Sequence, residues 1–215
     1  MIVIDTEGLG AFDESQNHDV RIFTLAILLS SSFIYNSVGS IDESSLNQLS
    51  LVVNLTKHIQ LKGNRDEDDP EEFQKIFPSF MWVVRDFTLQ LQDAAGNRIT
   101  PKEYLEQALK ETKGVSDSAE QKNRIRRLLK AFFSERDCVT TVRPINEESE
   151  LQNLAHLPLE QLRPEFREQV SLLRKKVLGK MKPKSLQGRR INGAILVSLA
   201  MQYCQAINDG GVPNI

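Results

Sequence analysis

Cysteine and histidine are scarce in this chain of 215 residues, which has 2 cysteines and 3 histidines. Two cysteines, Cys138 and Cys204, cannot form a disulfide framework, and no histidine lies near them at a zinc-ligand spacing. This usage predicts a reducing, cytoplasmic environment. An excess of one charge is also lacking, since 27 basic residues balance 29 acidic ones for a net charge of −2. That balance argues against a dedicated nucleic-acid-binding protein.

Long hydrophobic runs are missing as well. The longest apolar-rich stretch, Ile22 to Tyr35, is interrupted by Thr24 and three serines. It falls short of the roughly 20 residues that span a bilayer. The amino terminus has no basic leader and reaches acidic residues at once, which argues against a secretory or transit peptide. We therefore expect a soluble protein, and the length suits one domain over residues 1–215.

Short apolar runs alternate with amphipathic stretches along the chain. β-branched and aromatic residues predict strands at 1–4, 31–37, 80–87 and 138–142. The segment 20–29 fits either a buried helix or a strand by periodicity, and we predict a helix. Further helices are predicted at 44–59, 100–110, 118–133, 165–180 and 192–208. This alternation predicts an α/β fold with a mostly parallel sheet flanked by helices.

Two of the predicted helices carry basic runs. One is RIRRLLK, from Arg124 to Lys130, and the other is LLRKKVLGKMKPK, from Leu172 to Lys184. We interpret both as solvated helix faces, because acidic segments elsewhere balance their charge. A surface for a membrane or a partner is the less favoured alternative.

The first candidate motif is Asp5-Thr6-Glu7-Gly8, which follows the first predicted strand. An aspartate at a strand end can hold Mg²⁺ through a water, because this hard cation prefers oxygen ligands. The glycine lets its backbone N–H approach a phosphate without a Cβ in the way. Taken alone, the D-x-x-G pattern fits an ordinary acidic turn more often than a nucleotide site.

The second candidate motif is Arg85-Asp86, at the end of the third predicted strand. A carboxylate can accept two parallel hydrogen bonds from the ring N–H and the amino group of guanine, a donor pair that adenine lacks. Arg85 could pack over the base or hold the loop. An Arg-Asp pair alone is more often a surface ion pair. Both motifs follow strands, and ligands of parallel sheets bind beyond the carboxyl ends of the strands.

The chain resembles the GTP-binding domain of the guanylate-binding protein family, large GTPases of the dynamin superfamily with atlastin-like relatives. The resemblance covers nearly the whole chain and rests on ordered segments: IVIDTEGLGAFDES, FPSFMWVVRDFTLQL, ITPKEYLEQAL, FFSERDCVTTVRP, LRPEFREQV and NGAILVSLAMQYCQAINDGGVP. It implies an incomplete Ras-like P-loop NTPase fold, a G domain, that belongs to a GTPase. In that family Arg-Asp replaces the usual Asn-Lys-x-Asp of the guanine-reading motif.

The resemblance also implies roles for individual residues. The segment Asp5-Thr6-Glu7-Gly8-Leu9 would face the phosphates of GTP or GDP, with Mg²⁺ held by Asp5 through a water. Glu7 would be the catalytic member, a polar relay that orients the attacking water. Asp86 would read guanine, with Arg85 beside it. The loop 140–151 would cap the base and contact a second subunit in a GTP-dependent homodimer through Arg143.

The phosphate-binding loop G-x-x-x-x-G-K-[ST], which P-loop NTPases use in phosphoryl transfer, does not occur in the 215 residues. In the resembled family that loop precedes the DTEG strand, so we expect this chain to begin downstream of it and to be inactive alone. The strand feeding that loop would lie between those ending at Asp5 and Asn36, leaving both with an unpaired edge.

Three interpretations remain. The chain is part of a GTP-hydrolysing protein, a non-catalytic member that acts as a protein-interaction module, or an unrelated α/β protein whose likeness is coincidental. Membrane contact is expected only through regions outside this chain. The expected location is therefore the cytoplasm, or the cytosolic face of an endomembrane for a longer protein.

Overall fold

A three-stranded parallel sheet forms the centre of the computed structural model, which describes residues 1–6, 16–49, 77–114, 116–186 and 188–209. Its strands are β1 (Ser32–Val38), β2 (Ser79–Arg85) and β3 (Arg136–Thr140), in the order β1-β2-β3. Each neighbouring pair is parallel, and their carboxyl ends lie at one edge of the sheet. The predicted α/β fold with a parallel sheet is confirmed.

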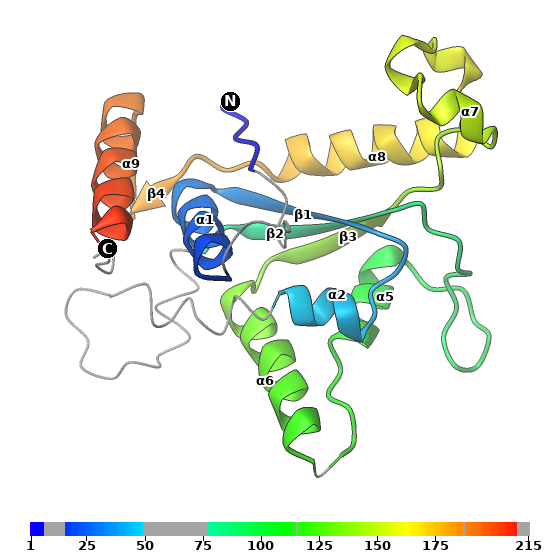
Figure 1. The fold of residues 1–215 in the computed structure, drawn as a ribbon, viewed down its shortest axis with the longest axis horizontal. Coiled ribbons are helices and arrows are strands. Elements are labelled where there is room, and N and C mark those ends of the chain that lie inside the picture. The colour runs from blue at the N-terminus through cyan, green and yellow to red at the C-terminus, as the bar shows by residue number, and fades with distance from the viewer. Residues whose placement is uncertain (7–15, 50–76, 115, 187, 210–215) are drawn as a thin grey trace.

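Helices cover both faces of this sheet (Figure 1). α8 (Pro164–Lys180) lies along one face, and α2 (Glu43–Gln48), α5 (Pro101–Ala108) and α6 (Asp117–Phe132) lie on the other. α9 (Gly193–Asn208) packs against α1 (Gln16–Leu29). The remaining described elements are α7 (Glu148–Leu151), the 3₁₀ turns η1 (Leu154–His156) and η2 (Leu159–Gln161), and the short strands β4 (Ser185–Leu186) and β5 (Arg189–Arg190).

The apolar run of β2 is buried on both faces, as a central parallel strand requires. Phe80, Trp82 and Val84 belong to the main core, which includes buried residues of α1, α2, α5 and α6. Met81 and Val83 point to the other face, where Val139 and Leu173 of α8 pack with them. Alternate residues of one strand therefore serve two separate layers.

Helix boundaries follow the capping residues closely. Thr100 accepts a hydrogen bond from the Glu103 backbone, and the Glu103 side chain accepts one from the Thr100 backbone. These two bonds form a capping box, with Pro101 as the first helical residue, at the start of the helix predicted over 100–110. Asp42 caps α2 through a 2.8 Å hydrogen bond from the Ser45 N–H. The choice of a helix for 20–29 is also confirmed.

Two predicted elements need correction. Residues 1–6 form no strand, and the side chains from Met1 to Ile4 are 56 to 85% exposed. A strand requires a hydrogen-bonding neighbour, and no described residue pairs with this segment. Among the described strands, β1 lies at an edge of the sheet, as expected. The helix predicted over 44–59 ends at Gln48, and Leu49 is its cap. Positions 50–59 of the predicted helix lie outside the described residues.

The basic runs are not simply solvated. Arg126 is only 3% exposed and forms an ion pair with Glu43 of α2. Lys176 and Lys180 both bind Asp137, whose side chain is 7% exposed. The interpretation of uniformly solvated faces is therefore wrong at these positions, because each cation has a carboxylate partner from another element. Among the described residues, no helix combines the length and apolar character that crossing a bilayer requires.

Candidate functional site

The carboxyl ends of β1, β2 and β3 come together around the turn at Arg85-Asp86. The Gly39 N–H donates to the Arg85 carbonyl at 2.8 Å on the β1 side. On the β3 side, the Thr141 N–H donates to the Val84 carbonyl at 2.8 Å, and the Phe87 N–H donates to the Thr141 carbonyl at 2.9 Å. The predicted base-reading motif is thus held by backbone hydrogen bonds from both neighbouring strands.

Asp86 adopts a left-handed backbone conformation, with φ of 53°. Among the described residues it is the single non-glycine residue with positive φ. Aspartate tolerates this region better than most residues, although the conformation still costs free energy. Such a conformation persists where surrounding contacts impose it, and these are often functional sites. The hydrogen bonds of Arg85 and Phe87 on either side of Asp86 supply that constraint.

Arg85 holds the strand ends together. Its Nε donates to Asn36 Oδ1 of β1 at 2.9 Å, and the Arg85 side chain is otherwise exposed. This hydrogen bond joins the ends of β2 and β1, and the role of Arg85 toward a nucleotide stays a prediction. Asn36 was not among the predicted site residues, and no motif in the sequence marks it.

Behind the turn, Phe87 is buried against Tyr104 of α5. The ring centroids are 5.5 Å apart in an edge-on arrangement. The Tyr104 hydroxyl accepts a hydrogen bond from the Ile41 N–H at 3.0 Å, which ties it to the segment after β1. Burial raises the pKa of Tyr104, so its hydroxyl stays protonated at neutral pH. Tyr104 therefore supports the turn from the core side.

The loop after β3 lies next to this turn. Thr140 and Thr141 are buried, and the Val142 N–H donates to Gln169 Oε1 of α8 at 2.7 Å. Arg143 is exposed and forms an ion pair with Glu148 at 3.0 Å. The candidate contact residue for a second subunit is thus engaged by an acidic residue of its own loop. Its role across a subunit interface stays a prediction.

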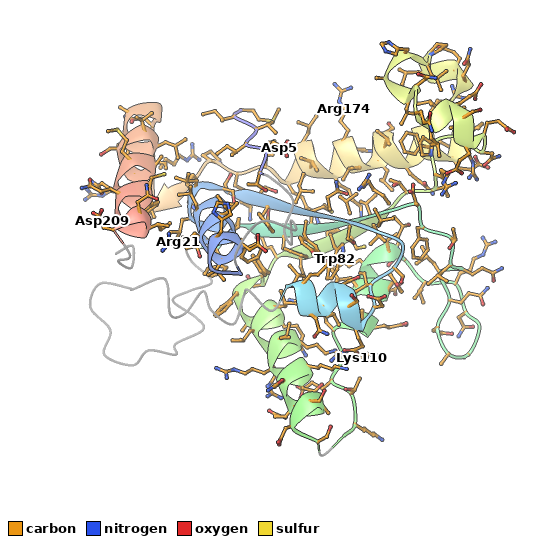
Figure 2. The ribbon with its side chains drawn as sticks, viewed as in Figure 1. Asp5, Arg21, Trp82, Lys110, Arg174 and Asp209 are labelled. Atoms are coloured by element: carbon orange, nitrogen blue, oxygen red, sulfur yellow. The ribbon has the colours of Figure 1, made fainter. Side chains whose placement is uncertain are left out.

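Of the acidic motif near the amino terminus, the structure describes Asp5 and Thr6 alone, and these two residues do not join this arrangement. Asp5 and Thr6 are exposed, and Glu7, Gly8 and Leu9 lie outside the described residues. Figure 2 shows Asp5 away from the carboxyl ends of the strands, toward the side of α9. The structure therefore gathers Arg85 and Asp86 with Asn36 and Thr141 but leaves Asp5 apart. The predicted phosphate-facing role of residues 5–9 remains untested.

The fit to Mg²⁺ can be judged from the oxygen ligands present. No group of three or more His, Cys, Asp or Glu side chains suited to a metal occurs among the described residues. Asp5 offers a single exposed carboxylate, which does not make a resident metal site. Mg²⁺ is often bound by one or two carboxylates together with substrate phosphates and waters. A lone aspartate fits only a cation that arrives with a nucleotide.

A cavity of about 320 Å³ lies at the opposite ends of the strands. Its lining includes Ser79, Arg136 and Lys180, near the amino ends of β2 and β3. It is therefore separate from the turn at Asp86. Ligands of parallel sheets bind beyond the carboxyl ends of the strands, so the turn at Asp86 is the stronger candidate.

Comparison with known proteins places this chain in a family. A family model described as "Guanylate-binding protein, N-terminal domain" matches residues 1–186. Human guanylate-binding protein 1 is 39% identical over 220 residues, covering 99% of this chain and 37% of that protein. Human guanylate-binding protein 6 and mouse guanylate-binding protein 7 are each 38% identical over 218 residues, with 34% of their length covered. The chain spans about a third of the length of these relatives.

Proposed function

Because the chain belongs to the guanylate-binding protein family, we propose that it binds guanine nucleotides at the carboxyl edge of its sheet and serves GTP hydrolysis. Asp86 reads the base in this proposal. One of the three interpretations from the sequence, an unrelated α/β protein, is set aside by the family match.

The observation that carries the proposal is the constrained turn at Arg85-Asp86. Asp86 is half-buried at the edge where ligands of parallel sheets bind, and contacts to β1 and β3 hold its backbone. A carboxylate can accept two parallel hydrogen bonds from guanine, and adenine offers no such donor pair. The constrained backbone favours binding, since this part of the turn loses little freedom when a ligand arrives.

The phosphate side of the proposal rests on residues 5–9. Asp5, Thr6, Glu7, Gly8 and Leu9 would face the phosphates, with Glu7 orienting the attacking water. Mg²⁺ would accompany the nucleotide, and Asp5 would contribute one oxygen through a water. Arg143 would contact a second copy in a GTP-dependent homodimer after leaving Glu148.

A non-catalytic interaction module is the second candidate. The observation that favours it is the lack of a G-x-x-x-x-G-K-[ST] motif in the 215 residues. Coding sequence for a G-x-x-x-x-G-K-[ST] motif upstream of this chain would decide between the two candidates in favour of the enzyme.

The decisive experiment compares GTP and ATP binding, with Mg²⁺ present, by this chain and by a version extended upstream from its own gene. We expect tight binding by the extended version alone and a preference for GTP that Asp86→Asn abolishes. Xanthine carries an oxygen in place of the amino group of guanine, so an asparagine should instead favour xanthine nucleotides. Asp117→Asn, an exposed change on α6, is the matched control. An unchanged preference in Asp86→Asn would refute the assignment of Asp86.

A further inference from the structure

The way the chain leaves β3 depends on a side chain of α8. After Thr141 bonds to Val84 and Phe87, the next residue has no strand partner among the described residues. Its N–H, that of Val142, instead donates to Gln169 Oε1 at 2.7 Å. Gln169 is half-buried on the helix that covers this face of the sheet. Beyond the end of the β2–β3 ladder, the Gln169 side chain therefore supplies the acceptor that a neighbouring strand would otherwise provide.

The helix that carries Gln169, α8, is attached to the sheet by ion pairs and by apolar packing. Lys176 binds Asp137 Oδ1 at 3.0 Å, and Lys180 binds Asp137 Oδ2 at 2.6 Å. Leu173 packs on the apolar residues of the same sheet face. Gln169, Leu173, Lys176 and Lys180 are spaced by four, three and four residues, so they form one stripe along the helix. This stripe is the face that α8 presents to the sheet.

The loop between β3 and α8 also contacts the N-cap residue of α8. The Arg163 N–H, at the cap of the helix, donates to the Pro144 carbonyl at 2.9 Å. Ile145 and Leu162 are both buried beside this contact. The loop between β3 and α8 is thus attached at two points, and the first of them is Gln169. In Figure 1 this loop, with α7, stands at the end of the sheet where the strands terminate.

We propose that Gln169 is a positioning residue for guanine recognition, acting through Val142 on the turn that carries Asp86. This inference rests on the proposed function. The connection is short: Gln169 fixes Val142, and Thr141 beside it accepts the hydrogen bond of Phe87, the residue after Asp86. Without the Gln169 oxygen, Val142 loses its partner, and the Thr141–Phe87 contact loses its support.

Two substitutions at one position test the proposal. Gln169→Met keeps the length of the side chain and removes the acceptor, whereas Gln169→Glu keeps an acceptor oxygen. Gln202→Met, an exposed change on α9, is the control. The first readout is hydrogen exchange at the Val142 amide, followed by protein-observed NMR on the 215-residue chain. The second is the ratio of GMP to AMP affinity, measured by ligand-observed NMR on the same chain. GMP and AMP serve as probes because they report the base with little contribution from phosphate contacts.

We expect Gln169→Met to speed Val142 exchange about tenfold, the effect of losing one hydrogen bond of ordinary strength. It should also lower the GMP preference several-fold, while Gln169→Glu stays within about twofold of the parent in both. A purely structural role would change stability and leave the preference intact, which would overturn the proposal. Equal behaviour of the Met and Glu variants would overturn it as well.

The same measurements distinguish failure of the proposed function from failure of the role of Gln169. If the parent shows no preference for GMP that Asp86→Asn removes, the assignment of Asp86 is wrong, and the role of Gln169 falls with it. If Asp86→Asn removes the preference and Gln169→Met does not reduce it, only the role of Gln169 is wrong.

Discussion

Arg85 and Asn36 are joined by a hydrogen bond of 2.9 Å, from the guanidinium Nε to the amide oxygen, across the ends of β2 and β1. A second link, from the Gly39 N–H to the Arg85 carbonyl, reinforces the same junction. The arginine of the Arg-Asp motif therefore acts on the protein itself. Under the proposed function, Arg85 supports the turn and Asp86 contacts the base.

Asn36→Ala should loosen this junction. The contact is exposed, so we expect a loss of about 1 kcal/mol or less in the free energy of unfolding. Arg85→Lys should have the same effect, because an ammonium cannot reproduce the fixed geometry of Nε. The double variant should cost little more than either single variant. Chemical denaturation of the four proteins measures this coupling, and fully additive losses would show that the contact contributes nothing.

Asp86→Gly separates the backbone of the turn from its chemistry. Glycine adopts positive φ without steric cost but loses more entropy on folding, so we expect stability within about 1 kcal/mol of the parent. Asp86→Val should instead destabilise by about 2 kcal/mol, because a β-branched residue is strained at φ of 53°. Thermal unfolding checks both. The glycine variant should nevertheless lose any preference for GMP over AMP, and a retained preference would argue against a base-reading carboxylate.

The fold was largely predictable because its local signals agree with the tertiary structure. The apolar run from Phe80 to Val84 is buried on both faces, so its sequence alone indicates a central strand. Thr100 and Glu103 define a helix start through contacts within one turn. The strand predicted at 1–4 was wrong, because strand formation depends on a neighbouring chain segment that local composition does not report.

The candidate site was only partly predictable. Asp86 could be proposed from a strand-end motif, but the hydrogen-bonding roles of Asn36 and Gln169 depend on residues distant in sequence. The surroundings of Lys176 and Lys180 were predicted wrongly for a different reason. The two lysines occupy the stripe of α8 that faces the sheet, and composition cannot show that Asp137 is buried beneath them. A basic run predicts a solvated face until the partner carboxylate is located.

The two cysteines should react very differently with a thiol reagent. Cys204 is exposed, whereas Cys138 is buried in β3. Burial is the main cause that raises the pKa of Cys138 to about 12, so little thiolate is present at neutral pH. We expect one equivalent to react quickly at pH 8 and the second only at the rate of unfolding. In Cys204→Ser the fast phase should vanish, and rapid labelling of Cys138 in that variant would contradict its burial.

Asp137 should make stability depend on pH in the acid range. Burial of its carboxylate acts to raise the pKa, but hydrogen bonds from Lys180 and Lys176 and from the Cys138 N–H leave it below its ordinary value of 3.8. The folded protein therefore binds the proton less readily than the unfolded chain. The stabilisation is fully present above pH 3.8 and is lost as pH falls through the folded pKa.

Asp137→Asn tests this directly. Lys176 and Lys180 are partly exposed and would keep some hydration, so we expect a loss of about 2 kcal/mol at pH 7. The difference in unfolding free energy between parent and variant should stay constant from pH 7 to about pH 4 and shrink below it. Asp42 and Asp93 also have lowered pKa values, through local hydrogen bonds, but both proteins share them and their effect cancels in the difference. Urea titrations at a series of pH values measure the difference. A constant difference down to pH 2 would mean that the two lysines do not stabilise the ionised carboxylate, and that α8 is held to the sheet by its apolar contacts.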